Sequence, residues 1–580
     1  MQARHSIDSM SAKLRYGGLV AVAVFLADVP FSQQTNAVPG PAGLREQKLS
    51  ATQGGFPGAL EPLDFFGVDV AAVDLDRDGR KELVVGAAGD DDSGPDHGAI
   101  WVFFLDDAGA IERSVKITDG QSGFSLGGPF SLLDPADFFG RGIDTLGDLD
   151  GDGVDDLLVG SYRDDDGGLN WGAAYVLFMR ADGTVGDHQK ISAIQGGFSA
   201  VLQDEDYLGA RVAGLGDVDG DGVPDAALSA SLDSVGGEER GAVYVCLLRP
   251  DGTVKTTVRV ADGYGGFSGP LDPFDHFGEG LAGIGDLDGD GVPDLAVGAI
   301  GDDDGGNGKG AVWILYLQPD GRVKAQTKIS ASAGGFSGEL DASDNFGSAL
   351  CAWREPGFSG TFLAVGALRD DDGGPERGAV WILRLAPDGS VLQHEKLSSD
   401  YGRLIGPIND FDFFGIGVAA LGDLDGRGRT DLAVGAWLDD DGGLELGSAW
   451  VFLREEVAHA NGAANPVPVT PTSGRRTTVD VDAVPLDPFG NAWELIARAP
   501  GVDRAWLLLE VHGAAAGLVA PPLGSFDLGL VPLDERALHV PFLPGHAART
   551  VELNSDGVAF GPLLHLRAPL SGVPVAGPLR

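Results

Sequence analysis

The stretch GDLDGDGVDDLLVG at residues 147–160 carries acidic side chains at every second position of a short loop. Four carboxylates and one backbone carbonyl form an all-oxygen donor set, which suits Ca²⁺, and the glycine at the sixth loop position allows the sharp turn that such a site needs. Carboxylates this close together repel one another unless a cation neutralises them. We therefore predict a calcium site whose ligands are Asp148, Asp150, Asp152, the Val154 carbonyl and Asp156.

Related loops occur elsewhere in the chain with different degrees of completeness. Two copies are intact, and an earlier copy has glutamate at the ninth position. In a late copy Arg427 replaces the central acid, which we expect to weaken or abolish binding, and the segment CAWREPGFSG at 351–360 lacks the pattern and is predicted to have no site. The further predicted ligands are Asp74, Asp76, Asp78 and Glu82; Asp217, Asp219, Asp221, Val223 and Asp225; Asp286, Asp288, Asp290, Val292 and Asp294; and Asp423, Asp425 and Asp431.

The position of the last acid distinguishes these loops from helix-flanked calcium sensors. The acid stands at position nine, whereas position twelve is Val159 inside an apolar run, and Pro224 and Pro293 occupy position eight in two copies. Such a loop leads directly into a strand. Extracellular sites of this kind bind calcium at ~10⁻⁴–10⁻³ M, so each adds only ~1 kcal/mol at about 1 mM calcium. We interpret them as structural clips.

The loops belong to a repeat. An Asp-x-[Phe/Leu]-Gly tetrapeptide occurs six times at intervals of 68 to 73 residues. Each unit contains four apolar runs separated by Asp/Gly turns, which indicates four strands. Four-stranded units of this length are typical of propeller blades, with an open solenoid as the alternative. The tetrapeptides begin at Asp64, Asp137, Asp206, Asp275, Asp344 and Asp412.

The chain ends of the repeat region favour a closed ring. The sixth unit ends at 450–453 without a fourth strand, and the missing strand QKLS lies at 47–50, before the first unit. Closure by this strand leaves no open sheet edge. The predicted fold is all-β: a six-bladed β-propeller at 38–454 whose N-terminal strand closes the last blade, a linker at 455–478 and a small β-sandwich at 479–580.

A second acidic position recurs in the turn after the second strand of each unit. In a four-stranded blade this turn lies on the face opposite the calcium loops, together with the tetrapeptides. One interpretation is an acidic ring that holds further cations or a basic partner, and the other is a set of aspartates that cap turn amides. The residues are Asp90, Asp164, Asp233, Asp302, Asp370 and Asp439.

An aromatic residue also recurs in the third strand of every unit. We predict that it packs between neighbouring blades, as do the phenylalanines of the tetrapeptides. The residues are Trp101, Tyr175, Tyr244, Trp313, Trp381 and Trp450.

Composition and the N-terminus restrict the function. A formal net charge of −47 excludes a nucleic-acid binder, because phosphate contacts need a basic surface. Lys13 and Arg15 precede an apolar run at 19–27 that is too short to span a membrane, so residues 1–37 are predicted to be a signal peptide, with an uncleaved anchor as the alternative. We expect an exported chain, extracellular, at the cell surface or periplasmic, with no transmembrane segment after cleavage and with Cys246 and Cys351 buried and unpaired.

No catalytic constellation stands out. The ten histidines do not share a repeat position, and no Gly-x-Ser-x-Gly elbow, Cys/His pair or zinc motif occurs. We therefore predict a protein that is not an enzyme, with Ca²⁺ as its only cofactor at about four structural sites.

The tetrapeptides such as DFFG at 137–140, the Asp-rich loops and the following VGA segments resemble FG-GAP repeats, the units of the integrin alpha-chain head propeller. Integrin heads have seven blades, whereas six units are present here. The resemblance implies an extracellular, calcium-stabilised adhesion or interaction protein without catalytic activity. We expect a monomer that recognises an extracellular protein or glycan, and the alternatives are a lyase-type propeller that acts on polysaccharides or a structural surface-layer component.

Overall fold

The computed structural model describes residues 44–126, 131–355, 360–399 and 407–454, together with eight short strands outside these ranges. The chain divides into two compact units. One comprises residues 40–457, and the other comprises 1–39 and 458–580. Within the described ranges we find no helix with the length and apolar character that a membrane crossing requires.

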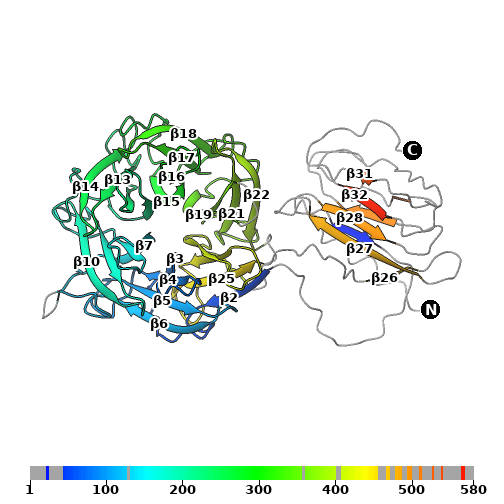
Figure 1. The fold of residues 1–580 in the computed structure, drawn as a ribbon, viewed down its shortest axis with the longest axis horizontal. Coiled ribbons are helices and arrows are strands. Elements are labelled where there is room, and N and C mark those ends of the chain that lie inside the picture. The colour runs from blue at the N-terminus through cyan, green and yellow to red at the C-terminus, as the bar shows by residue number, and fades with distance from the viewer. Residues whose placement is uncertain are drawn as a thin grey trace. The chain divides into compact units, whose positions relative to one another are not determined.

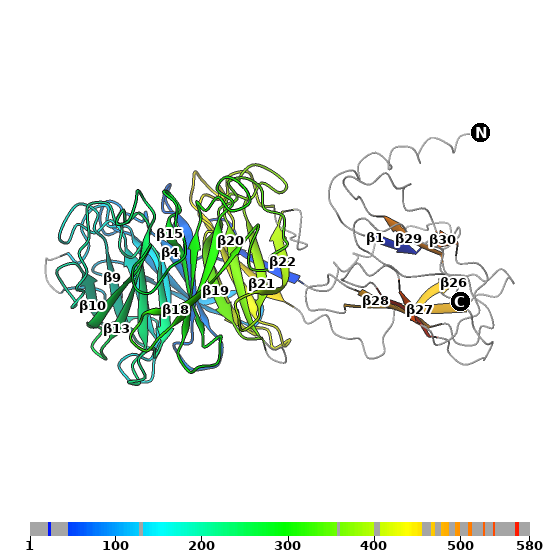
Figure 2. The ribbon, with the colours of Figure 1, turned by 90° about the horizontal axis from the view of Figure 1, so that it is seen from above.

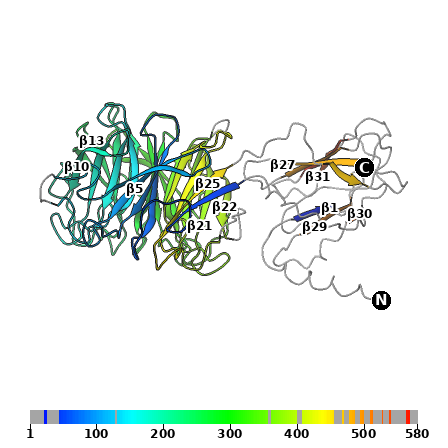
Figure 3. The same cartoon turned by 90° about the horizontal axis from the view of Figure 1, so that it is seen from below.

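The first unit is a ring of six four-stranded antiparallel sheets around a central axis (Figure 1), which confirms the predicted propeller. The first strand of each blade lines the axis, because each contacts the first strand of the next blade and the last contacts the first. Seen edge-on, the strands run between two faces where the loops gather (Figure 2 and Figure 3). The first five blades are β3 (Phe66–Val73), β4 (Glu82–Ala87), β5 (Ala99–Leu105), β6 (Ile111–Ile117); β7 (Phe139–Gly147), β8 (Asp156–Ser161), β9 (Ala173–Met179), β10 (Val185–Ser192); β11 (Val212–Gly216), β12 (Asp225–Ala230), β13 (Ala242–Leu248), β14 (Val254–Val260); β15 (Phe277–Gly285), β16 (Asp294–Ala299), β17 (Ala311–Leu317), β18 (Val323–Ser330); and β19 (Phe346–Trp353), β20 (Thr361–Ala367), β21 (Ala379–Leu385), β22 (Val391–Ser398).

The sixth blade is completed by the N-terminal strand, as the missing repeat strand predicted. It consists of β23 (Val418–Gly422), β24 (Asp431–Ala436), β25 (Ser448–Arg454) and β2 (Leu44–Leu49). Strand β2 pairs antiparallel with β25, with Leu49 opposite Ala449, and the two strands lie side by side in Figure 1. The two ends of the repeat region therefore share one sheet, and the ring has no open blade.

Neighbouring blades approach closely at paired glycines. A Cβ added to Gly160 of β8 would lie 1.9 Å from the Gly209 carbonyl oxygen of blade three, and a Cβ on Gly435 of β24 would lie 1.9 Å from that of Gly67 in blade one. A real Cβ does not fit at such a distance. Glycine is thus required at these four positions because two backbones touch there.

The predicted packing of the third-strand aromatics between blades is confirmed. Phe124 follows the outer strand of blade one, and its ring centroid lies 5.4 Å from that of Tyr175 in blade two. Phe56 follows β2 and lies 5.0 Å from Trp101 of blade one, so the same contact operates across the closure. Edge-to-face aromatic pairs at this distance stabilise by about 0.5–1.5 kcal/mol beyond the area they bury.

The two cysteines differ in their surroundings. Both are free, and Cys246 is buried as predicted. Cys351 is only partly buried, which corrects the expectation for this residue, because its strand β19 borders the central axis, where a cavity reaches it.

The second unit contains two sheets. Their orders are β26-β27-β28-β32-β31 and β1-β29-β30. Strand β1 lies within the predicted signal peptide and pairs antiparallel with β29. The remainder of segments 1–37 and 455–478 lies mostly outside the described residues, and the β-sandwich stays a prediction. The bounds are β1 (Ala21–Val24), β26 (Pro466–Val469), β27 (Thr477–Pro485), β28 (Trp493–Arg498), β29 (Leu508–His512), β30 (Phe526–Asp527), β31 (Ala537–His539) and β32 (Leu563–Arg567).

The closure can be tested at Leu49, whose side chain is fully buried at the end of β2. Leu49→Ala should lower the free energy of unfolding of the propeller by about 2–5 kcal/mol, because it opens a cavity in the core of the closing blade. Leu392→Ala is the matched control, since Leu392 also lies on an outer strand but is 55% exposed. Urea denaturation of both variants measures the difference, and equal effects would contradict the closing role of β2.

Candidate metal centres

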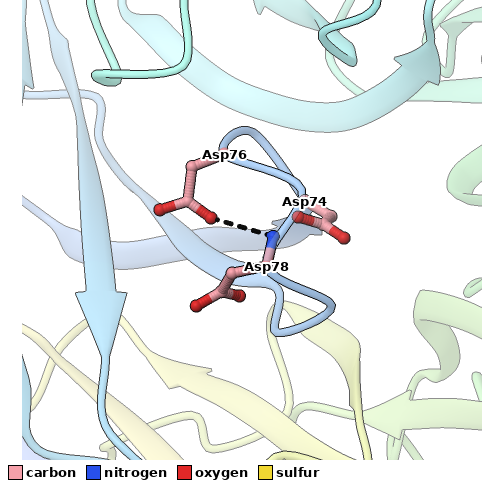
Figure 4. Close-up of side chains that lie close together, drawn as sticks. All are labelled: Asp74, Asp76 and Asp78. Carbon is pink, nitrogen blue, oxygen red and sulfur yellow. Dashed lines mark hydrogen bonds between the residues drawn. The ribbon is translucent and has the colours of Figure 1, made fainter.

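The structure brings three carboxylates together in five of the six loops that connect the first and second strands of a blade. Figure 4 shows the loop of blade one, where the Asp78 amide donates a hydrogen bond of 3.2 Å to Asp76 Oδ1. Within each cluster one carboxylate oxygen of every member lies within 4.8 Å of the others. The clusters are Asp74, Asp76 and Asp78; Asp148, Asp150 and Asp152; Asp217, Asp219 and Asp225; Asp286, Asp288 and Asp290; and Asp423, Asp425 and Asp431.

The acid at position nine has a second role that the sequence did not reveal. Asp156 is 1% exposed, and its two carboxylate oxygens accept hydrogen bonds of 3.0 Å from the amides of Leu149 and Met179. It therefore ties the loop to the end of the third strand of its own blade. Burial raises the pKa of Asp156 to about 7, because the carboxylate has lost its solvent. The equivalent residues Asp225, Asp294 and Asp431 make the same two bonds.

The loops of blades one and two each contain a carboxylate oxygen that lacks a hydrogen-bond donor among the described residues. Asp74 Oδ1 and Asp148 Oδ1 are buried and receive no hydrogen bond. A buried acceptor without a donor costs about 1–3 kcal/mol. The oxygen ligands of these two loops therefore fit Ca²⁺, which would satisfy the orphaned atoms. By contrast, Asp217 in blade three accepts hydrogen bonds of 2.7 Å from Gly220 and 2.8 Å from Gly222.

Blades three and four contain an internal cation in the loop. Lys255 of β14 lies 2.8 Å from Asp219 Oδ2 and also contacts Asp221. Lys324 of β18 lies 2.9 Å from Asp288 Oδ2 and makes the equivalent second contact to the next acid of its loop. Crowded carboxylates therefore do not require a metal there, because an ammonium supplies positive charge. The sequence feature that indicates this lysine is the Val-Lys pair that begins the outer strand of these two units.

Blade two has the least neutralised cluster. Asp150 and Asp152 form no ion pair with any residue that the structure describes, and Asp148 meets only Arg77 of blade one, at 3.5 Å. In blade six Arg45 of the closing strand lies 2.7 Å from Asp425 Oδ2, and Arg427 lies 3.3 Å from the same atom. Electrostatics therefore favours calcium most in the loop of blade two.

In blade five a buried glutamate connects the end of the first strand to the next blade. Glu355 is 2% exposed, accepts a hydrogen bond of 2.7 Å from Trp353 Nε1, and accepts another of 2.9 Å from the Thr430 amide of blade six. Residues 351–355 and 360 of this segment are described, and they form no carboxylate cluster. A side-chain clip to the next blade thus stands where the other blades have an acidic loop.

Comparison with known proteins agrees with this architecture. The FG-GAP repeat family matches residues 66–103 and 277–315, which cover the first two strands and most of the third strand of blades one and four. The chain carries FG-GAP repeats. The glycines of that signature are the ones at which neighbouring blades touch.

Integrin alpha chains are similar to part of this protein. Integrin alpha-PS2 of Drosophila melanogaster is 33% identical over 202 residues, which are 34% of this chain and 13% of that protein. Integrin alpha-5 of Xenopus laevis is 32% identical over 245 residues, 41% of this chain and 20% of that protein. Integrin alpha-6 of Homo sapiens is 30% identical over 172 residues. The chain thus spans a fifth or less of these relatives.

On the opposite face of the FG-GAP propeller, the aspartates in the turn after the second strand of each blade are buried. Asp302 is 3% exposed; its Oδ1 accepts a 3.0 Å hydrogen bond from the Asp304 amide, and its Oδ2 lies 2.5 Å from Lys328 Nζ. The ammonium also lies 5.2 Å from the ring centroid of Trp313, a favourable cation–π position. All six blades repeat the aspartate–base pair, with Lys48, Lys116, Lys190, Arg259, Lys328 and Lys396 as the bases.

The tetrapeptide aspartates are buried beside these pairs. Asp275 Oδ2 accepts a 2.8 Å hydrogen bond from the Asp272 amide, and burial raises the pKa of Asp275 to about 6, helped by the negative charge of Asp302. The other five tetrapeptide aspartates bond the equivalent amide three residues upstream. Of the two interpretations of these acids, turn capping is confirmed. The open acidic ring is wrong, because both sets are buried and already bonded.

The paired base can be tested at Lys328. Lys328→Met leaves Asp302 without its partner and should lower the free energy of unfolding by about 3–5 kcal/mol at pH 7. Burial already raises the pKa of Asp302 and the lysine opposes this, so the variant raises that pKa further. Stability held by a raised carboxyl pKa is lost as the pH rises, and the deficit should therefore shrink as the pH is lowered.

Denaturation at several pH values measures this effect. Arg322→Met is the control, because the Arg322–Asp320 pair is 59% and 62% exposed and contributes about 0–1 kcal/mol. A deficit at Lys328 that is no larger than the control, or that grows at low pH, would contradict the assignment.

Proposed function

We propose that this protein is a secreted or cell-surface calcium-binding β-propeller that acts as an adhesion or interaction module for an extracellular protein or glycan. The observation that carries the proposal is the similarity of its FG-GAP blades to integrin alpha chains, combined with acidic loops that retain an unsatisfied carboxylate oxygen. Export rests on the predicted signal peptide. In this proposal the protein is a monomer. It has no catalytic role and binds no nucleic acid.

Calcium would have a structural task in this protein. In blade two the ligands are Asp148, Asp150, Asp152, the Val154 carbonyl and Asp156, with the equivalent residues in the other loops. A bound ion supplies positive charge between carboxylates that otherwise repel. Asp156 also bonds the end of the third strand, so neutralising its loop stabilises the hairpin of the first two strands and its connection to the third. The ion thus stabilises the scaffold that presents the recognition surface.

Chelation should weaken the fold. Removing calcium with EGTA should lower the melting temperature by a few degrees, since each weak site contributes ~1 kcal/mol at about 1 mM calcium. Asp148→Asn should remove most of the part of this shift in melting temperature that the site in blade two contributes. Asp107→Asn, at an exposed turn of blade one, should leave the shift unchanged. Differential scanning calorimetry of the full chain with and without EGTA measures the shift. An unchanged melting temperature would refute the calcium clip.

Recognition is tested by screening the full chain against extracellular protein and glycan arrays, with calcium and with EGTA. We expect a ligand that is retained in calcium and weakened by the chelator, because the loops support the scaffold. Release of modified oligosaccharide from an arrayed glycan would instead identify an enzyme. Absence of any ligand would contradict the adhesion proposal without affecting the calcium clip.

The internal lysines should compete with calcium. Lys255→Met and Lys324→Met should each tighten calcium binding at their own loop by up to about fivefold, from the ~1 kcal/mol of a partly exposed ion pair. Arg322→Met is the matched control, because this exposed base precedes Lys324 by two residues without contacting the loop acids. Isothermal titration calorimetry measures affinity and stoichiometry. Unchanged binding in both lysine variants would show that the ammonium groups do not occupy the metal position.

A further inference from the structure

Several inner-strand residues break the sixfold repeat with charged side chains. They are Asp69 in β3, Arg141 and Asp144 in β7, Arg211 directly before β11, and Glu279 in β15. The corresponding positions of the other blades carry uncharged residues, mostly Gly or Ala. These charges are therefore not part of the repeated scaffold.

One arginine crosses the axis of the ring. Arg211 of blade three lies 3.1 Å from Asp69 Oδ1 of blade one. Its Nη2 donates a hydrogen bond of 2.7 Å to the Ile416 carbonyl of blade six, and its Nε donates one of 3.1 Å to the Glu279 carbonyl of blade four. Arg141 of blade two lies 3.0 Å from Glu279 Oε1. These bonds join five blades across the centre.

A cavity of about 200 Å³ lies on the axis next to this crossing. The inner-strand residues that line it stand three to six positions after the Phe or Leu that opens each inner strand, and Lys81 at the end of the first calcium loop also lines it. Arg141 and Glu279 stand only two positions after that residue and are not part of the lining. The Arg211–Asp69 pair therefore bounds the cavity on the tetrapeptide side, and the cavity extends toward the calcium loops.

Two opposite charges in this cavity have no ionic partner. Asp144 accepts hydrogen bonds from the amides of Thr145, at 2.8 Å, and Gly214, at 3.0 Å. Lys81 Nζ donates one hydrogen bond of 3.3 Å to the Ala420 carbonyl. Neither forms an ion pair with a residue in the described part of the chain. Burial raises the pKa of Asp144 to about 6 and the negative charge of Asp69 adds to the shift, whereas the two amide hydrogen bonds and the charge of Lys81 oppose it.

We propose that this axial cavity binds a small zwitterion, whose ammonium group contacts Asp144 and whose carboxylate contacts Lys81. Both groups are partly exposed, and a ligand with both charges satisfies the two of them, which a singly charged ligand does for only one. The volume is below the ~300–1,000 Å³ of ordinary ligand pockets, which favours a ligand of amino-acid size.

The test uses the full chain, saturated with calcium, and isothermal titration calorimetry with glycine, β-alanine and 4-aminobutyrate. Acetate and methylammonium serve as singly charged probes. We expect at least one amino acid of the series to bind with 1:1 stoichiometry, at least tenfold more tightly than either singly charged probe. Asp144→Asn should weaken this binding at least tenfold. Asp187→Asn, at an exposed position of the same blade, should leave it unchanged.

The proposal is overturned if none of the three amino acids binds, if acetate or methylammonium binds equally well, or if Asp144→Asn binds as the native chain does. Should Asp144→Asn show no cooperative melting transition, the comparison between zwitterions and singly charged probes on the native chain decides the question. The outcome is independent of the surface recognition proposed above, because the cavity lies on the axis and the arrays report on larger ligands.

Discussion

The structure depends on how closely neighbouring blades approach one another at their paired glycines. Where Gly160 faces the Gly209 carbonyl, and again where Gly435 faces Gly67 across the closure, no side chain fits between the two backbones. This approach brings the inner strands together around a narrow axis and removes solvent from the adjoining turns. Aspartates in those turns are then buried, and each needs a fixed partner, because an unpaired buried charge is costly. The aspartate–lysine pair of every blade follows from this constraint.

One residue type serves three physical roles in this propeller. Asp302 is a buried partner for a lysine, Asp156 is a clip that bonds two amides, and Asp150 is an exposed acid that forms no ion pair with the described residues. Burial and neighbours separate these roles, since all three residues lie in Asp/Gly-rich turns. The net charge of −47 is therefore carried by acids outside these pairs, because an aspartate paired with one base adds nothing to it.

The blades also differ in what they add to the common scaffold. Blades one and two keep carboxylate oxygens that lack a donor, blades three and four supply a lysine to the loop, and blade five replaces the loop by Glu355. The axis carries Arg211, which bonds three other blades. The repeated features form the ring, and residues that depart from the repeat add charged side chains to single blades and to the axis. The segments that match the FG-GAP repeat family lie within the repeated part of the chain.

The sequence alone determined the repeated features: six four-stranded units, the closing strand before the first unit, and the acidic loops with their carboxylates at fixed spacing. These follow from local rules, because strand period, turn residues and the glycine positions act within one unit. Only the tertiary structure decided which carboxylates are already paired. Lys255 meets Asp221 from 34 residues away, and Arg211 meets Ile416 from 205 residues away. Such contacts depend on where the fold brings distant segments together, and a repeat pattern alone does not state which side chains meet there.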